Sequence, residues 1–183
     1  MSQGAFDTAR AEAFGARVTS ILNDGALSLM LSIGHRAGIF DAMRALGEAT
    51  CEDLARRAGL NERYVREWLG ALVTGGIVLH DPRKATFALP AEHAAVLTRA
   101  ARPHNLAATS QWIPLLARVE DEVLHCFEHG GGVPYAAYER FHEVMAEESE
   151  QSVLGALGET ILPLAPGLPD ALERGIEVLD VGC

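Results

Sequence analysis

The feature that most constrains the fold is a series of local start and stop signals between residues 50 and 89. Thr50 followed by Asp53 has the spacing of a capping box, and Asn61 is suited to cap a second helix. Between them, Gly59 fits the left-handed backbone with which many helices end. The pattern predicts two helices that are joined by a tight turn.

A β-hairpin is predicted directly after these two helices. Residues 77–79 and 86–89 are short β-prone runs, and the turn-forming residues 81–84 lie between them. Two helices, a tight turn and a hairpin are the elements of a winged helix-turn-helix. We therefore expect a mainly α-helical fold with one small hairpin.

The N-terminal part predicts three helices, over 7–22, 26–37 and 39–46, with a break at 23–25. Apolar residues nearly encircle the helix over 26–37. Such a helix has to be covered on most sides, either by its own domain or by a second subunit. A homodimer in which two copies bury these helices around a twofold axis is therefore expected.

The second half is predicted to be helical as far as a short terminal strand. A glycine-rich break stands at 130–135, and prolines at 163, 166 and 169 indicate a linker. The run 177–181 is apolar apart from its acids and precedes Gly182, which is typical of a buried strand in a parallel sheet. The expected helices cover residues 90–98, 105–112, 114–128, 136–161 and 171–174.

Composition excludes several classes of protein. The 183 residues are 49% hydrophobic and 22% charged, which is ordinary for a globular chain, and no apolar run is long enough for a transmembrane helix. No signal peptide is recognisable, and three widely spaced cysteines suggest reduced thiols in a cytoplasm. Residues 91–183 hold five basic and fifteen acidic side chains, which equals the whole net charge of −10. This acidity argues against nucleic acid as the main partner.

Several motifs together resemble a known family, the class I S-adenosylmethionine-dependent methyltransferases that carry an N-terminal winged-helix dimerisation domain. The segment Val178 to Cys183 is similar to the first strand of their cofactor-binding domain. Residues 25–97 look like the winged-helix region of a bacterial group of small-molecule methyltransferases. The motifs that carry this likeness lie, in the family's order, at 61–69, 89–94 and 130–135.

The resemblance implies a division into three parts and a function. Residues 1–98 would be the dimerisation domain, 99–174 a helical substrate lid and linker, and 175–183 the start of a Rossmann-like catalytic domain whose remainder is missing. The whole enzyme would use S-adenosylmethionine to methylate a small-molecule acceptor, and the fragment alone would be inactive. No catalytic residue can be assigned.

The resemblance also suggests binding residues. Asp180 and Gly182 would shape the cofactor pocket, and Tyr135 would contact the cofactor from a loop that can close over it. Trp112 and Tyr138 are the candidates for contact with the acceptor. A flexible turn that carries a packed tyrosine, and a tryptophan in the core, are the plainer alternatives.

Two further interpretations stay open at this stage. Arg63 and Arg66 begin the helix that would read DNA in a winged-helix transcription regulator, although a solvated face is the plainer and favoured explanation. His125 and His129 have the i, i+4 spacing of metal ligands, but no second ligand pair is evident, so we expect no metal site.

Overall fold

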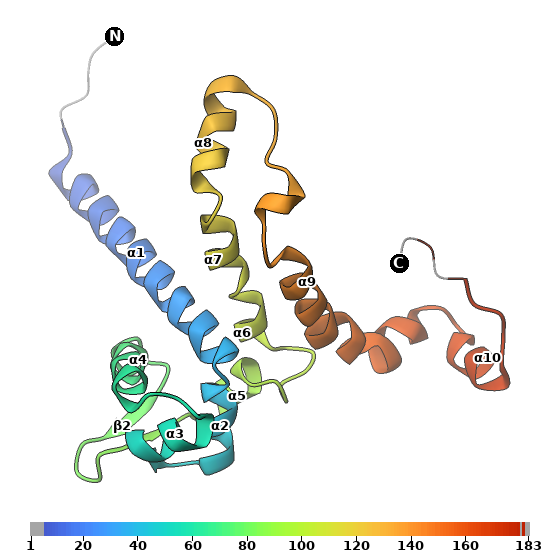
Figure 1. Ribbon diagram of the computed structural model, residues 1–183, viewed down its shortest axis with the longest axis horizontal. Coiled ribbons are helices and arrows are strands. Elements are labelled where there is room, and N and C mark those ends of the chain that lie inside the picture. The colour runs from blue at the N-terminus through green and yellow to red at the C-terminus, as the bar shows by residue number, and fades with distance from the viewer. Residues whose placement is uncertain (1–5, 180, 182–183) are drawn as a thin grey trace.

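The computed structural model describes residues 6–179 and 181, and it is mainly helical with a three-stranded sheet. The chain forms a small domain of helices and strands from which two helical projections extend (Figure 1). We call α2 to α5 with the sheet the winged-helix domain (residues 39–97), and α6 to α10 the helical arm (residues 106–174). In order, the helices are α1 (Thr8–Arg36), α2 (Ile39–Leu46), α3 (Cys51–Ala58), α4 (Glu62–Thr74), α5 (Ala91–Leu97), α6 (Leu106–Thr109), α7 (Trp112–Ala117), α8 (Glu120–His129), α9 (Phe141–Ser149) and α10 (Leu168–Arg174).

The N-terminal region contains one helix where the sequence predicted two. The expected break at 23–25 is wrong, since α1 runs without interruption from Thr8 to Arg36. Near the expected break, the Ser28 hydroxyl donates to the backbone oxygen of Asp24, one turn earlier, over 2.9 Å. The helix ends as predicted, because Gly38 adopts a left-handed φ of 70° and begins α2.

The winged helix-turn-helix is confirmed, with its predicted caps. The Thr50 hydroxyl accepts from the backbone N–H of Asp53 over 3.2 Å, Gly59 ends α3 with φ of 69°, and Asn61 accepts from the Arg63 N–H over 3.1 Å. The hairpin consists of β2 (Leu79–Asp81) and β3 (Thr86–Ala88), so its first strand starts two residues later than predicted. A third strand, β1 (Ala49–Thr50), was not predicted, and it pairs antiparallel with β3.

The core lies inside the winged-helix domain, and Met30 and Leu31 at the end of α1 pack against it. Phe40, Met43, Leu54, Leu69 and Leu72 are completely or almost completely buried there. Trp68 packs edge-on against Phe40 with ring centroids 5.2 Å apart, and its Nε1–H donates to the Met30 carbonyl over 2.8 Å. The indole therefore fixes α1 against α4.

The helical arm is more broken than predicted. The helix expected over 105–112 covers only α6, and the one expected over 114–128 is divided into α7 and α8 near Val119, where φ is −111°. The helix expected over 136–161 is likewise replaced by shorter pieces. These are a 3-10 turn η1 (Tyr135–Ala137), α9, wider π-type turns η2 (Glu150–Leu154) and η3 (Leu157–Ile161), and a second 3-10 turn η4 (Leu162–Leu164).

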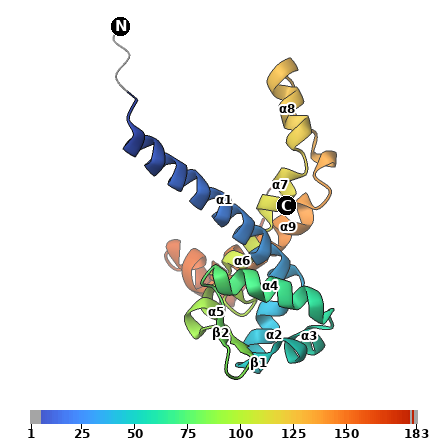
Figure 2. The same ribbon diagram turned by 90° about the vertical axis from the view of Figure 1, so that its left-hand side faces the viewer.

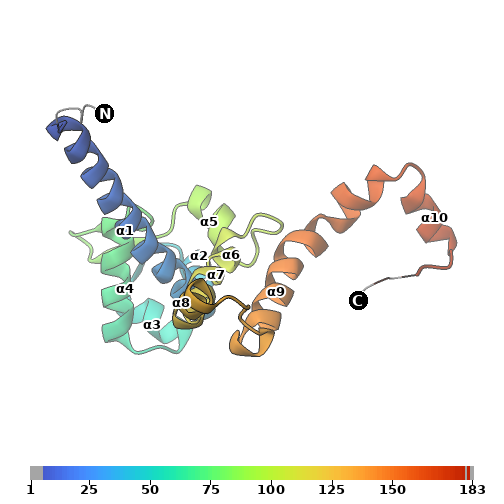
Figure 3. The same cartoon turned by 90° about the horizontal axis from the view of Figure 1, so that it is seen from above.

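The two projections diverge from the winged-helix domain. Figure 2 shows α1 and the α7–α8 segment leaving the domain in different directions. Seen from above, the chain from α9 to α10 leads away from the domain (Figure 3). At the base, α6 packs against α1, α5 and α9, which joins the arm to the domain.

The predicted terminal strand is not formed. Residues 175–179 have no regular structure, and Val178 and Leu179 are 70% and 85% exposed. A strand needs a neighbouring strand to receive its hydrogen bonds, and the described part of the chain places none beside this segment. Asp180 and Gly182, the predicted cofactor residues, lie outside the described residues.

Candidate functional site

Three of the predicted site residues meet around one phenylalanine. Trp112 begins α7, Tyr135 begins η1 and Tyr138 follows it, and all three rings pack edge-on against Phe141 at the start of α9. The ring centroids lie 5.3, 5.3 and 6.2 Å from that of Phe141. We call these four residues the aromatic cluster. Edge-to-face packing of this kind adds stability beyond the area that the rings bury.

Phe141 and a neighbouring carboxylate were not predicted as site residues. Glu148 accepts from the Trp112 Nε1–H over 2.6 Å and from the Thr109 hydroxyl over 3.1 Å. One signal in the sequence could have pointed to Phe141. Tyr138 and Phe141 are three positions apart, the spacing of two side chains on the same side of a helix. Nothing local in the sequence indicates that Trp112, 29 positions earlier, shares this surface.

The aromatic cluster offers a surface that another molecule could contact. Tyr135 is 72% exposed, so one ring of the cluster faces solvent. Gly130 and Gly131 precede it with φ of 74° and 98°, a backbone that favours glycine. Exposed aromatic rings beside a carboxylate can stack on a planar molecule and accept a hydrogen bond from it.

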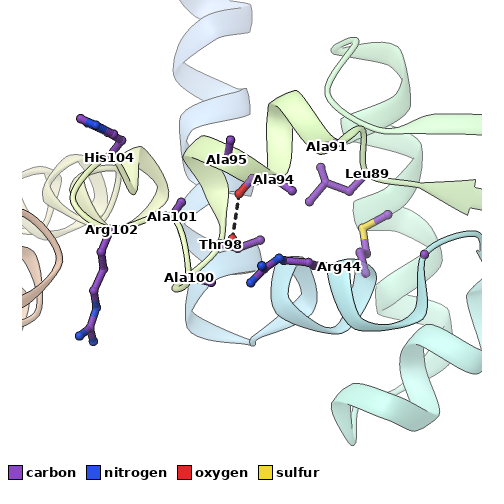
Figure 4. A pocket seen from close by; sticks show the side chains of 12 residues that line it. Arg44, Leu89, Ala91, Ala94, Ala95, Thr98, Ala100, Ala101, Arg102 and His104 are labelled. Atoms are coloured by element: carbon purple, nitrogen blue, oxygen red, sulfur yellow. Dashed lines mark hydrogen bonds between the residues drawn. The ribbon is translucent and has the colours of Figure 1, made fainter. Parts of the chain in front are cut away.

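A separate cavity of about 540 Å³ lies between α2, α5 and residues 98–104. Small side chains such as Ala94 and Ala101 line it, over a floor that includes Met43 and Leu89. The Arg44 side chain points into it, whereas Arg102 and His104 point away (Figure 4). None of the predicted site residues lines this cavity, so the sequence provides no assignment for it.

Two of the basic side chains that a DNA reader would use, Arg66 and Lys84, are engaged within the chain. Arg66 donates through Nε to Glu62 over 3.0 Å, and this hydrogen bond raises the pKa of Arg66. In the hairpin turn, Lys84 donates to Glu48 over 3.0 Å. Each cation therefore lies beside an acid, which weakens the attraction to phosphate.

The histidine pair on α8 stands by itself among the residues that the structure describes. His125 and His129 stack with ring centroids 4.4 Å apart. Within residues 6–179 and 181, no group of three or more His, Cys, Asp or Glu side chains is arranged to hold a metal ion. The helices of the same residues also lack the combination of length and apolar character that crossing a bilayer requires.

One domain model matches part of this chain, and several solved structures share its fold. Residues 25–99 match the model of the Rv2258c-like winged HTH domain. No curated protein matches the chain in sequence. Among solved structures, the mitomycin 7-O-methyltransferase MmcR is similar with a TM-score of 0.59 and 20% identity, over 80% of this chain.

Two further structures extend the likeness. PigF, solved with SAH, has a TM-score of 0.55 and 19% identity over 78% of this chain. Human N-acetylserotonin methyltransferase, solved with SAM, has a TM-score of 0.57 and 15% identity over 91% of this chain. The chain spans about half of these proteins, with 46%, 45% and 51% of their lengths covered. Residues 25–99 therefore resemble the Rv2258c-like winged HTH domain, and the chain shares its fold with part of each of these three solved structures, two of which are named as methyltransferases.

Proposed function

We propose that this chain is the dimerisation and acceptor-covering part of an S-adenosylmethionine-dependent methyltransferase that acts on a small molecule. The observation that carries the proposal is the extent of the fold match. The likeness to N-acetylserotonin methyltransferase covers 91% of the chain, so it includes the helical arm as well as the winged helix. A DNA-binding winged helix would not need this arm.

In this proposal the aromatic cluster covers the acceptor. Trp112 and Tyr138 would contact it, and Tyr135 would lie toward the cofactor. Asp180 and Gly182 would begin the cofactor pocket, whose remainder belongs to a catalytic domain after residue 183. The cofactor supplies a methyl group already activated by its sulfonium, so what remains for these residues is to orient the acceptor and exclude water.

The proposal is tested by turnover of a longer chain that continues into the catalytic domain. We expect S-adenosylhomocysteine to form in the presence of a suitable acceptor, and a Trp112→Ala variant to raise KM more than it lowers kcat. The 183 residues alone should not bind S-adenosylmethionine at micromolar concentration in calorimetry. Tight binding to them, or no transfer by the longer chain with a broad panel of acceptors, would contradict the proposal.

The dimer part of the proposal rests on the exposed apolar side of α1. Phe14 and Leu22 are 69% and 68% exposed, and Ile21 and Ile33 are about half exposed. Apolar residues repeated along a projecting helix are costly in water, and a second copy of the same helix would cover them. Obligate interfaces of this kind usually bury more than about 2,000 Å².

Light scattering over a dilution series tests the dimer. We expect the chain to remain dimeric at micromolar concentration and Ile33→Glu to be monomeric, because the new charge would lose its water in the interface. Arg10→Glu, which changes a charged position of α1, is the control and should stay dimeric. A well-folded monomeric wild type would exclude this assembly.

The alternative function, a DNA-binding regulator, is favoured only by the winged-helix fold itself. Its test is an electrophoretic mobility shift at low salt, where binding to phosphate is strongest. We expect any weak association to be nearly unchanged in the Arg63→Ala, Arg66→Ala double variant. A large, sequence-dependent loss would restore the regulator hypothesis.

A further inference from the structure

One carboxylate on α9 connects this helix to three other segments of the chain. Glu147 Oε1 lies 2.8 Å from His35 Nε2, at the end of α1. Glu147 Oε2 accepts from the Gln111 Nε2–H over 2.7 Å, just before α7. Arg99, in the segment after α5, places Nη2 3.6 Å from Oε1. We call Glu147, His35, Gln111 and Arg99 the polar junction.

The partners of Glu147 are themselves fixed in position. His35 is 1% exposed, and Gln111 is fully buried. Arg99 donates through its backbone N–H and its Nη1 to the Asp41 carboxylate of α2, over 2.9 and 2.7 Å, and through Nη2 to the His35 carbonyl over 2.9 Å. The junction therefore ties α9 to the two helices that border the domain core.

His35 makes a single side-chain hydrogen bond, and it is to Glu147. In the described residues, His35 Nδ1 is the one buried side-chain nitrogen or oxygen that has no hydrogen-bond partner. A neutral imidazole that donates from Nε2 fits this arrangement, because Nδ1 is then only an unused acceptor.

Glu147 stays ionised in this setting. Burial raises the pKa of its carboxyl group, but hydrogen bonds from Gln111 and His35, with the positive charge of Arg99, outweigh burial and hold the pKa below its ordinary value of 4.5. Hydrogen bonds to a charged acceptor are stronger and more directional than those between neutral groups. The Glu147 carboxylate therefore forms strong hydrogen bonds that hold α9 against its neighbours.

The residue next to Glu147 belongs to the candidate site. Glu148 accepts from the Trp112 indole, and Phe141, two turns earlier on α9, is the centre of the aromatic cluster. Val144, between them, is fully buried. Because α9 moves as one short helix, whatever holds Glu147 also sets the place of Phe141 and Glu148.

We propose that Glu147 and His35 are positioning residues that fix α9, and with it the aromatic cluster, against the winged-helix domain. Opening this contact would release the cluster while the domain core stays folded. The importance of the inference rests on the proposed function, in which the cluster covers the acceptor. The contact itself can be tested without any methyl transfer.

The chain contains two tryptophans, which report on the two sides of this contact. The Trp112 Nε1–H donates to Glu148 in the arm, and the Trp68 Nε1–H donates to Met30 in the domain core. Their indole N–H signals in a ¹⁵N-labelled sample of the 183-residue chain can be followed separately. Exchange of each indole proton with water then measures how often each region opens.

We expect Glu147→Ala to shift the Trp112 signal and to speed its exchange by about tenfold or more, as loss of hydrogen bonds to a charged group implies. The Trp68 signal should stay in place. His35→Leu should act in the same direction, and His35→Gln, which keeps an N–H donor near the Nε2 position, should restore most of the protection. Glu150→Ala is the control, since Glu150 is an exposed acid adjoining α9 that pairs with Arg102.

Two results would overturn the inference. An unchanged Trp112 signal in Glu147→Ala and His35→Leu would mean that the cluster is held by other contacts. Loss of both indole signals together would mean that the junction supports the whole fold rather than α9. Failure of the proposed function would show differently, as absent turnover in the longer chain with the indole results intact.

Discussion

The winged-helix domain and the helical arm are held together by different kinds of interaction. Apart from Ala107, the buried apolar cluster is formed entirely by residues 39–97. The arm buries few apolar side chains, among them Leu115 and Val144, and it also buries the polar Gln111 and Gln151. Its outer helix α8 has no fully buried residue. One region is therefore stabilised by packed volume and the other by directional contacts.

This difference explains how one part of the chain can be stably folded while another part opens locally. Burial of apolar area is non-directional and dominates the free energy of folding. Hydrogen bonds contribute less net stability, but they specify one geometry and can be opened singly. Regions with few buried apolar contacts open locally more easily than packed cores. Local opening is therefore expected in the arm before the domain core.

The largest expected effect is a cavity in the domain core. Leu69 is completely buried in α4, so Leu69→Ala should lower the free energy of unfolding by about 2–5 kcal/mol. Leu79→Ala, at a side chain that is 59% exposed in β2, is the control and should cost less than about 1 kcal/mol. Urea unfolding followed by circular dichroism measures both. Equal losses would mean that burial in this core does not decide the stability of the domain.

The next largest effect is expected when two glycines of α1, one packed and one exposed, are each changed to alanine. A Cβ at Gly34 would clash with the Trp68 ring and lie 2.8 Å from Phe40 Cε2, so Gly34→Ala should destabilise by about 1–3 kcal/mol. A Cβ at Gly15 meets nothing within 4 Å, and Gly15→Ala should stabilise by up to about 1 kcal/mol through helix propensity. Thermal melting should move in opposite directions for the two variants. The same direction for both would show that α1 does not pack as described.

The same chemical change can be made in both regions at helix N-caps. Asn61 caps α4 in the domain, and Asn105 accepts from the N–H groups of Ala107 and Ala108 at the start of α6. Each change to Ala should cost about 1 kcal/mol. In hydrogen exchange, Asn105→Ala should speed exchange within residues 106–109 only, whereas Asn61→Ala should lower protection throughout the domain. Identical exchange patterns would remove the distinction between the two regions.

The smallest expected effect is a loss of stability at acid pH that is confined to the helical arm. Because the pKa of Glu147 is lowered in the folded chain, its ionised form contributes stability above pH 4.5, and that contribution is lost as the pH falls further. Trp112 protection should therefore decline below this pH before that of Trp68. In Glu147→Gln this difference should largely disappear, since the amide does not titrate. If the protection of both indole protons declined in parallel in the wild type, Glu147 would not be the cause of the acid sensitivity of the arm.

Local chemistry in the sequence determined the elements of the winged helix. Thr50, Gly59 and Asn61 act over three or four residues, through side-chain hydrogen bonds to nearby backbone groups or through a left-handed backbone. Such signals work in any surroundings, so they could be read without the structure. They failed in α1, where the polar residues 23–25 were predicted to break a helix that in fact continues.

Only the tertiary structure decided which distant side chains meet. The convergence of Trp112, Tyr135 and Tyr138 on Phe141 depends on how η1 turns the chain back before α9, and no periodicity records it. The contact between His35 and Glu147 joins residues 112 positions apart. The sequence specifies such pairs through the packing of the whole molecule rather than through spacing. The apolar run near residue 178 illustrates the same limit, because β propensity produces a strand only where another strand supplies its hydrogen bonds.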